Sequence, residues 1–338
     1  MKLLVIGGTV FLGRHLVDAA LQAGHEVTLF TRGEHNPDLF PEAEKLRGDR
    51  DGNLDALAGR RWDAAIDTCG YFPRVVRQSA ELLADAVDHY TFVSTISVYT
   101  DISRPGITEN APVGTLDDPS MEEITGETYG PLKALCERVV LDAFRGRSVV
   151  PRPGLIVGPF DPSDRFTYWS HRLAQGGKVL APGHPNRDVQ LIDARDLAAW
   201  MLRMSEARGT GVYNATGPAR PLTMGRVLWE CKAQSRSKAE IVWVDEPFLL
   251  ERGVQPWMEL PLWVPDTAEY AGFSAFDCSR AINAGLTFRP LADTVAHTLT
   301  WDATRPPDME RAAGMAPDKE RELLAAWAAN TPARGSVS

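Results

Sequence analysis

The first thirty residues constrain the fold more than any other part of the chain. Lys2 to Ile6 (KLLVI) is a short apolar run ending in glycines, which predicts a strand buried on both faces. Apolar residues then recur at helical spacing from Leu12 to Ala20, Gly24 ends that pattern, and Val27 to Phe30 (VTLF) predicts a second strand. Strand, glycine turn, helix and strand together form a βαβ unit, which requires a parallel sheet.

The alternation of strand and helix patterns continues to about residue 153. It predicts three more strands and two more helices. The strands are Ala64 to Thr68, Tyr90 to Thr95 and Ser148 to Pro153, and the helices are Val75 to Val87 and Tyr129 to Phe144. We therefore expect an α/β fold with a doubly wound parallel sheet of the Rossmann type.

Beyond about Pro159 the periodicity weakens and tryptophans become frequent. We expect residues 1–160 to form the dinucleotide-binding core, with segments near 188–217 returning to it. Residues 161–305 are expected to belong mostly to a smaller substrate lobe over the carboxyl ends of the strands. Residues 306–338 are expected to be a C-terminal extension with one amphipathic helix near Glu320 to Ala329 and a frayed end.

Composition narrows the class of protein. The chain has 338 residues and a formal net charge of -9, which disfavours nucleic acid as the main partner. The four cysteines are far apart, so we expect neither a disulfide framework nor a metal site, and a reducing cytoplasm fits best. We expect no signal peptide and no membrane association, because no apolar run approaches the roughly 20 residues of a membrane helix.

The glycine turn nearly matches a dinucleotide-binding loop. Its position after a strand and before a helix raises the weight of a motif that is weak by itself. The departure is Val10, which stands where a regular motif has glycine, so the pyrophosphate would sit slightly further out. The alternative is a structural turn without a ligand. The candidate loop residues are Gly7, Gly8, Thr9, Val10, Phe11, Leu12 and Gly13, with Phe11 expected to pack into the core.

The end of the second strand bears on which dinucleotide is bound. NAD enzymes of this fold place an acid there to bind the ribose 2′-hydroxyl, but here Thr31 is followed by Arg32. An arginine suits a 2′-phosphate by its charge and its fork of donors, so we expect NADP, with NAD as the alternative. The competing interpretation is that Arg32 is a solvated residue and that Glu34, or nothing, contacts the ribose.

A second motif lies in the stretch TYGPLKALCERVV. Tyr129 and Lys133 are one turn apart on a predicted helix and therefore point the same way. A lysine ammonium near a phenol favours phenolate and makes the tyrosine a better proton shuttle. The competing interpretation is an ordinary exposed helix pair.

Five motifs in this order resemble the extended short-chain dehydrogenase/reductase family, in its NAD-dependent epimerase/dehydratase branch. They are the glycine loop, the pair Gly48–Asp49, the segment STISVY, the YxxxK pair and RPGLIVGP from Arg152 to Pro159. The resemblance covers residues 1 to about 300. The GGxxxxG spacing resembles an atypical subgroup, whose members are labelled variously as epimerases, isoflavone-reductase-like proteins and chloroplast RNA-binding proteins.

The resemblance implies a role for individual residues. Tyr129 is similar to the general acid/base, and Lys133 to the lysine that tunes it and holds the nicotinamide ribose. Thr95 is similar to the catalytic hydroxyl residue, with Ser94 as the second choice. The resemblance also implies further cofactor contacts. Asp49 would lie near the adenine, and Pro153 and Ile156 would lie near the nicotinamide. The other implied contacts are Arg50, and Cys69 and Gly70 after the fourth strand.

These residues imply an NAD(P)-dependent oxidoreductase or epimerase that moves a hydride at a hydroxyl or keto carbon, possibly of a nucleotide-linked sugar. Tyr129 would move the proton, and Thr95 would hydrogen-bond the same oxygen. Dehydration is disfavoured, because Ile96 and Ser97 stand where an acidic pair would be needed. The alternative from another class is a cofactor-holding RNA-binding or regulatory protein without turnover. We also expect a homodimer, formed through helices near Val75 to Val87 and Leu132 to Phe144.

Other chemically capable residues are assigned simpler roles. His171 and His184 are expected to be solvated loop histidines, since they lack metal-ligand spacing. Trp257 and Trp263 are expected in the core of the lobe rather than stacked on a sugar. Three arginines are most simply interpreted as surface charges, with diphosphate binding as the alternative: Arg172, Arg187 and Arg195. Gln190 and Asp193 are candidates for the wall of the pocket.

Overall fold

The structure is a computed structural model that describes residues 1–330, and it divides the chain into two compact units. Unit 1 contains residues 1–156, 190–220 and 275–288, and unit 2 contains residues 157–189, 221–274 and the described residues from 289 on. Residues 275–288 belong to unit 1, where the Gln190 side chain pairs with the backbone of Phe276. The expected domain bounds stay a prediction. Residues 331–338 of the expected C-terminal extension lie outside the described residues.

Unit 1 is built on a seven-stranded sheet with the order β11-β6-β5-β4-β1-β2-β3, in which every neighbouring pair is parallel. The expected doubly wound Rossmann sheet is therefore confirmed. The strands are β1 (Lys2–Ile6), β2 (Glu26–Thr31), β3 (Glu44–Arg47), β4 (Trp62–Asp67), β5 (Val87–Phe92), β6 (Ser148–Pro153) and β11 (Gly211–Ala215). A short pair, β7 (Leu155–Val157) and β10 (Leu191–Asp193), stands apart from this sheet.

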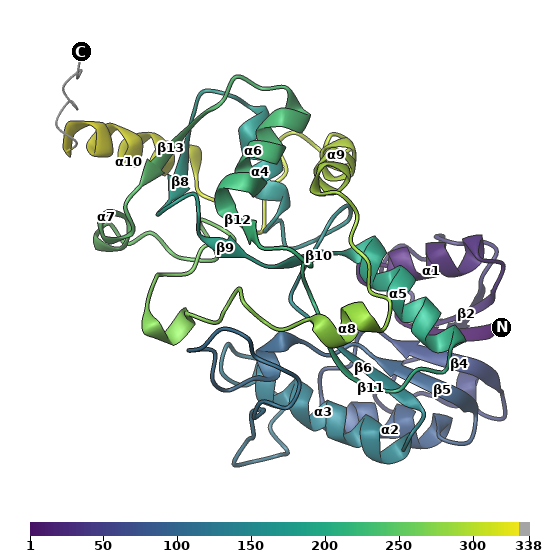
Figure 1. Cartoon of the computed structure of the whole chain (residues 1–338). Coiled ribbons are helices and arrows are strands. Elements are labelled where there is room, and N and C mark those ends of the chain that lie inside the picture. The colour runs from purple at the N-terminus through teal and green to yellow at the C-terminus, as the bar shows by residue number, and fades with distance from the viewer. Residues whose placement is uncertain (331–338) are drawn as a thin grey trace. The chain divides into compact units, whose positions relative to one another are not determined.

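Helices cover both faces of the sheet in unit 1 (Figure 1). The helices are α1 (Leu12–Gln22) and α5 (Ala194–Glu206) on one face, and α2 (Pro73–Leu83) and α3 (Tyr129–Ala143) on the other. Side chains alternate between faces along a strand, so Leu3 and Val5 pack with α1 and α5, while Leu4 and Ile6 pack towards α2 and α3. All four are at most 1% exposed, which explains why β1 is a continuous apolar run.

Two predicted boundaries in unit 1 are wrong. The helix expected to reach Val87 ends at Leu83, and Val87 instead begins β5, where it pairs with Trp62. The strand therefore starts three residues before Tyr90. Strand β3 was not predicted, because its sequence EKLR has no apolar alternation and it lies at the edge of the sheet, with partners on one side only. Short elements in unit 1 are η1 (Asp55–Leu57), η2 (Ile96–Val98) and α8 (Ser279–Asn283).

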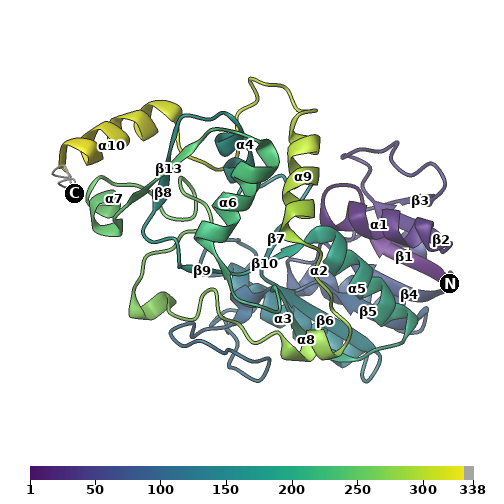
Figure 2. The same ribbon diagram turned by 45° about the horizontal axis from the view of Figure 1, so that its top comes forward.

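Unit 2 has less regular structure. In it, α4 (Thr167–Ala174), α6 (Met224–Ser235) and α9 (Leu291–Asp302) pack on one another, as Figure 2 shows. Its strands form a parallel pair, β8 (Lys178–Pro182) with β13 (Glu240–Val244), and an antiparallel pair, β9 (Asp188–Val189) with β12 (Leu222–Thr223). The remaining elements are α7 (Glu246–Glu251), η3 (Ala268–Tyr270) and α10 (Pro317–Asn330), so the amphipathic helix expected near Glu320 is present.

Within residues 1–330, none of the helices combines the length and the apolar character that crossing a bilayer would require.

Candidate functional site

The glycine loop joins β1 to α1 and has the backbone geometry that its sequence predicts. Gly7 and Gly8 have φ of 99° and 106°, which residues with a side chain rarely adopt. A Cβ on Gly13 would lie 2.7 Å from the Cα of Gly8, so the helix starts in direct contact with the turn. These glycines therefore leave the carboxyl end of β1 open to a ligand's approach, at the start of a helix whose first N–H groups favour an anion.

Val10 and Phe11 sit in the loop in different ways. The Val10 side chain is 45% exposed, and Phe11 packs against the core cluster that includes Leu16 and Val17 of α1. The expected packing of Phe11 into the core is thus confirmed. The side chain of Val10, which stands where a regular motif has glycine, is exposed to solvent. The turn accommodates a valine because that residue lies outside the close contact between Gly8 and Gly13.

The loop after β4 lies directly against the glycine loop. A Cβ on Gly7 would be 2.6 Å from the Thr68 hydroxyl, and that hydroxyl donates to the Ile6 carbonyl at 3.0 Å. Strands β1 and β4 are the point where the strand order reverses, and in open α/β sheets ligands bind at such a point. Cys69 is half-buried here and its thiol contacts the Ile6 carbonyl at 3.5 Å.

Arg50 is part of a buried ion pair that the sequence did not predict. Its two terminal nitrogens each donate to Asp67 at 2.8 Å, and one also donates to the Ser79 hydroxyl at 2.7 Å. The Asp67 side chain is fully buried, and it also accepts from the Tyr90 hydroxyl at 3.1 Å. These contacts commit Arg50 to holding β4 and α2 together beneath the loop, rather than presenting its charge to a cofactor.

Lys133 joins three parts of the site. Its ammonium donates to the Gly70 carbonyl at 2.5 Å and to the Val93 carbonyl at 2.7 Å, and it lies 4.2 Å from the centre of the Phe92 ring. The side chain is buried, and burial lowers its pKa to about 8. The amine is therefore protonated at neutral pH, with its charge held between the ends of β4 and β5.

Tyr129 is the first residue of α3, one turn before Lys133. The start of this helix is pressed against η2, because a Cβ on Gly130 would overlap the Ser97 carbonyl oxygen. Tyr129 and Tyr71 are near enough for the charge of one phenol to raise the pKa of the other, and burial with this effect raises the pKa of Tyr71 to about 12. The helix thus brings Tyr129 to the carboxyl ends of β4 and β5.

The structure separates the two hydroxyl candidates after β5. Thr95 caps η2, with its Oγ1 accepting from the Ser97 amide at 3.1 Å. The Ser94 hydroxyl instead donates to the buried carboxylate of Glu137, which also binds Arg152 through two hydrogen bonds. Ser94 is thereby committed to the core, and Thr95 is the hydroxyl that lies in the segment against which α3 begins.

The network around Glu137 was missed by sequence reasoning. Arg152 also donates to the Tyr99 hydroxyl at 2.9 Å, and that hydroxyl donates to Asn214 at 2.5 Å. Glu137 and Arg152 are 3% and 5% exposed. A signal was present, because Glu137 follows Lys133 by one turn on the same helix face as Tyr129, where a carboxylate must find a partner if it is buried.

The residues expected at the adenine end lie at the carboxyl ends of β2 and β3. Arg32 is exposed and pairs with Glu34 at 2.9 Å. The Asp49 carboxylate accepts from the Asp51 amide at 3.0 Å, in a turn closed by backbone bonds between Asp49 and Asn53. Both positions follow the carboxyl ends of two neighbouring strands of the sheet, and their contacts with a cofactor stay a prediction.

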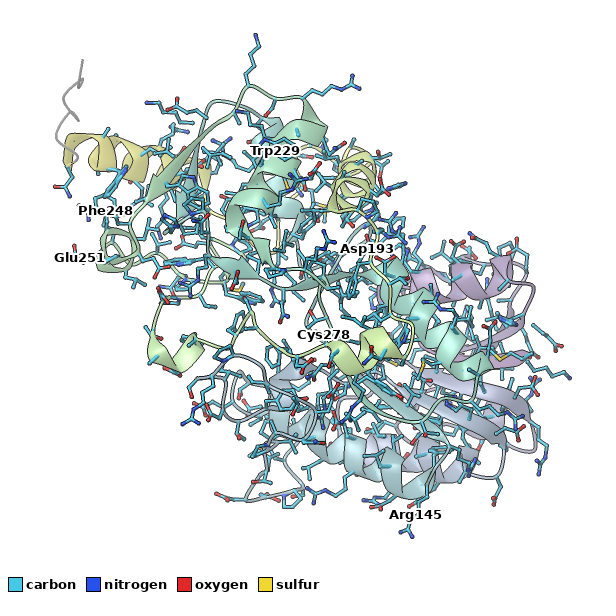
Figure 3. All side chains as sticks on the ribbon, in the orientation of Figure 1. Arg145, Asp193, Trp229, Phe248, Glu251 and Cys278 are labelled. Carbon is cyan, nitrogen blue, oxygen red and sulfur yellow. The ribbon has the colours of Figure 1, made fainter. Side chains whose placement is uncertain are left out.

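The other candidates of unit 1 have structural partners. Pro153 ends β6 and Ile156 lies in β7, where it is half-buried. Asp193, labelled in Figure 3 with Cys278, caps α5 and forms an ion pair with Arg195 at 2.7 Å.

In unit 2 the assignment of one histidine is wrong. His171 lies on α4, and its Nδ1 is 2.8 Å from the Asp302 carboxylate and 2.7 Å from the Arg311 guanidinium. Arg305 and Arg311 both bind Asp164, which is 1% exposed, so this is a buried charge cluster. A histidine in a helix that faces such a cluster cannot be recognised from its sequence spacing. His184 is exposed, as expected.

The remaining candidates of unit 2 also have partners. Trp263 is 1% exposed and donates to Glu246, which confirms a core role, and Trp257 is half-buried against Phe273. Arg172 is not a surface charge, because it binds Glu320 at 2.6 Å with 16% of its side chain exposed. Arg187 contacts Glu246 at 3.1 Å.

The comparisons with known proteins agree with this geometry. Residues 3–72 match the model of the NAD dependent epimerase/dehydratase family. The expected resemblance to this family is confirmed. The GGxxxxG subgroup stays a prediction.

One relative is the chloroplast stem-loop binding protein of 41 kDa b from Arabidopsis thaliana, 26% identical over 64% of this chain. The match spans 58% of that protein's own length, and other curated relatives are matched over about half of theirs. Among solved structures, UDP-N-acetylglucosamine 4-epimerase from Bacillus cereus is 16% identical, with a TM-score of 0.66 over 89% of this chain and 99% of that one. The Bordetella bronchiseptica enzyme WbmH, in complex with NAD+, is 15% identical, with a TM-score of 0.65 over 90% and 98%. The structural likeness shows the fold.

Proposed function

We propose that this protein is an NAD(P)-dependent epimerase or oxidoreductase that acts on a hydroxyl or keto carbon of a nucleotide-linked sugar. The observation that carries the proposal is the arrangement at the start of α3, where Tyr129 and Lys133 share a helix face and Thr95 caps the segment packed against that helix. The solved epimerase from Bacillus cereus, which shares the fold, supports the nucleotide-sugar class.

A dinucleotide fits the residues of unit 1. The turn after β1 has no side chain at Gly7, Gly8 or Gly13, and close packing shows that none could be added without displacing a neighbour. A bound nicotinamide dinucleotide would supply the hydride acceptor and donor. Gly7 to Gly13 would bind the pyrophosphate, Asp49 would contact the adenine, and Cys69, Gly70, Pro153 and Ile156 would line the rest of the site.

The chain's own residues would then handle the proton. Tyr129 takes the proton from the substrate hydroxyl, or returns it to the carbonyl, in the step that breaks or forms the C–H bond. Thr95 holds the same oxygen by a hydrogen bond and fixes its position. Lys133 places a positive charge beside the tyrosine and favours its phenolate form, because opposite charges stabilise one another most where water is excluded.

The arginine after β2 leads us to propose NADP(H) as the preferred dinucleotide, although the solved relative WbmH holds NAD+. Arg32 carries a positive charge at the position where an acid would select NAD.

We also propose a homodimer through α2 and α3, on which Leu82 and Leu141 are each 37% exposed.

One experiment tests both the cofactor and the substrate class. The full chain is titrated with NADH and NADPH by fluorescence, and then incubated with oxidised cofactor and UDP-linked sugars while products are separated. We expect cofactor binding and conversion to an epimer or a keto sugar. Absence of binding by either dinucleotide would remove the proposal, whereas binding without conversion of any UDP-sugar would remove only the substrate class.

The Arabidopsis relative gives one specific reason to consider a second function, because its name describes stem-loop binding. A nucleic-acid-binding role without turnover would have to overcome a formal net charge of -9, which repels phosphate backbones. Retention of a labelled RNA stem-loop on a filter at two salt concentrations tests it. Salt-sensitive retention combined with no turnover would favour this second function.

A further inference from the structure

Strands β2 and β3 end side by side, and each end carries an arginine. Thr31, the last residue of β2, is paired in register with Arg47, the last residue of β3. Arg32 follows Thr31 directly. The carboxyl end of β2 is where enzymes of this fold contact the 2′ position of the adenine ribose. Sequence reasoning considered Arg32 alone, because the register that brings Arg47 to the same place is a property of the folded sheet.

The two arginines differ in how their charges are used. Arg32 forms an ion pair with Glu34 at 2.9 Å, with the two side chains 56% and 57% exposed. Arg47 donates from Nη1 to the Thr31 hydroxyl at 2.8 Å, and within residues 1–330 no carboxylate is paired with it. The charge of Arg47 is therefore available to an incoming anion, whereas that of Arg32 is partly neutralised.

The Arg47 guanidinium is also held in place by a glycine. It lies flat against Gly33, where a Cβ would collide with Nη1 and Cζ. Gly33 has φ of 83°, a conformation that glycine adopts at little cost. The Thr31 hydroxyl and the Gly33 backbone limit the orientations of this exposed side chain before a ligand arrives. Such preorganisation favours binding.

Arg47 lies between two segments that are proposed to bind other parts of the dinucleotide. The Asn36 side chain donates to the Thr9 carbonyl at 2.8 Å, which ties the segment after Gly33 to the glycine loop proposed for the pyrophosphate. In the other direction, Asp49 lies two residues after Arg47 and is the proposed adenine contact. Arg47 thus stands between the proposed adenine and pyrophosphate segments, where the ribose must lie.

We propose that Arg47 is the principal determinant of dinucleotide specificity in this chain and binds the 2′-phosphate of NADP(H), with Arg32 in second place. The inference rests on the proposed function, since it assigns a residue to the cofactor site. It follows that Arg47 discriminates NADPH from NADH and contributes little to the binding of NADH.

The test measures dissociation constants of NADPH and NADH for the wild type, Arg47→Ala and Arg32→Ala. It adds 2′,5′-ADP and 5′-AMP as ligands that differ only by the 2′-phosphate. Removing Arg47 should weaken NADPH and 2′,5′-ADP by about 10- to 100-fold, the scale of a lost charge-assisted hydrogen bond. The affinities for NADH and 5′-AMP should change by less than about 2-fold, because these ligands lack the group that the arginine binds. Arg32→Ala should give the smaller loss.

Two further variants control the result. Arg60 is an exposed arginine with one acidic partner, Glu44, and it lies before the amino end of β4, away from the carboxyl ends of the strands. Arg60→Ala should therefore change the affinity for neither dinucleotide. Gly33→Ala should reduce NADPH affinity by displacing Arg47 while that residue itself is kept. Circular dichroism confirms that each variant is folded.

The outcomes separate this inference from the proposed function. Unchanged NADPH affinity in Arg47→Ala, or an equal loss for both dinucleotides, overturns the role of Arg47 while leaving a cofactor-dependent enzyme in place. A wild type that binds neither dinucleotide overturns the proposed function, and the role of Arg47 falls with it.

Discussion

Units 1 and 2 both bury charged side chains, but they use them differently. In unit 1 the charge of Lys133 meets backbone carbonyls from the ends of two strands, one helical turn after Tyr129 in α3. In unit 2 the charges of Asp164, Arg305 and their neighbours meet one another. A charge surrounded by its counter-charges has its electrostatic interactions satisfied. A charge held by carbonyl dipoles can still act on a neighbouring reacting group.

This contrast predicts that substitutions around Lys133 in unit 1 change chemistry and that substitutions in the unit 2 cluster change stability. The largest effect is expected for Tyr129→Phe. Turnover should fall by about 100- to 10,000-fold, the usual contribution of a general acid/base group. NADPH affinity should stay within a few-fold, because the phenol's proposed partner is the reacting oxygen. Steady-state kinetics and a cofactor titration check both parts.

Two companion variants sharpen that prediction. Lys133→Ala should weaken both turnover and cofactor binding, since its ammonium joins the ends of β4 and β5 beside the proposed nicotinamide ribose. Thr95→Val should reduce turnover less than Tyr129→Phe, because it removes one hydrogen bond to the substrate oxygen. Near wild-type turnover in Tyr129→Phe would show that the YxxxK pair is not catalytic here, and would move the binding-protein alternative to first place.

The second prediction concerns the cluster of unit 2. Asp164→Ala should destabilise the protein by about 3–5 kcal/mol, because it leaves two arginines of a buried network without this partner. Cofactor affinity at 25 °C should not change in the protein that remains folded. Urea unfolding of the variant and of Asp266→Ala gives the comparison. Asp266 is 83% exposed, so its removal should cost less than about 0.5 kcal/mol. A loss of turnover in folded Asp164→Ala would break the contrast between the units.

The third prediction concerns Glu137, which shares a helix with the proposed catalytic residues of unit 1 but has structural partners. Glu137 lies in the same helix as Tyr129 and Lys133, yet it binds Ser94 and Arg152 as a structural pair. Glu137→Gln should destabilise by about 1–3 kcal/mol, the cost of a weakened buried charged hydrogen bond. Turnover should also fall modestly, with KM unchanged, because Glu137 binds Ser94 and Ser94 directly precedes Thr95. Equal stability of the variant and the wild type would contradict a stabilising role for the Glu137 carboxylate.

The smallest expected effect is a pH dependence that belongs to unit 1. Burial lowers the pKa of Lys133 to about 8. The lysine is charged below that pH and neutral above it, so its support for the Tyr129 phenolate is lost as pH rises through about 8. The rate at saturating substrate should therefore decline on the alkaline side near that value. The Lys133→Arg variant should not show this decline up to pH 10, because arginine keeps its proton. This holds whatever the residual rate of the variant. A decline at the same pH in Lys133→Arg would assign it to another group.

The regular part of unit 1 could be predicted because its signals are local. A strand buried on both faces, a glycine turn and an amphipathic helix are each visible within about ten residues, as in Lys2 to Gly24. Strand β3 could not be predicted, since an edge strand with the sequence EKLR has no apolar pattern and is specified by its pairing with β2. The end of α2 was misplaced for a similar reason, because Val87 is recruited into β5 by its neighbour Trp62.

Sequence motifs alone determined the parallel sheet, the open glycine turn and the placing of Tyr129 one helical turn before Lys133, because all of these depend on residues close together in the chain. Only the tertiary structure showed that Ser94 binds Glu137, which required Glu137 and Arg152 to meet from a helix and a strand. The same holds for Arg50 with Asp67, for His171 in its charge cluster, and for Arg47 beside Thr31. The partner of a buried or paired charge lies far away in sequence, so it is set by packing and register, which no local pattern records.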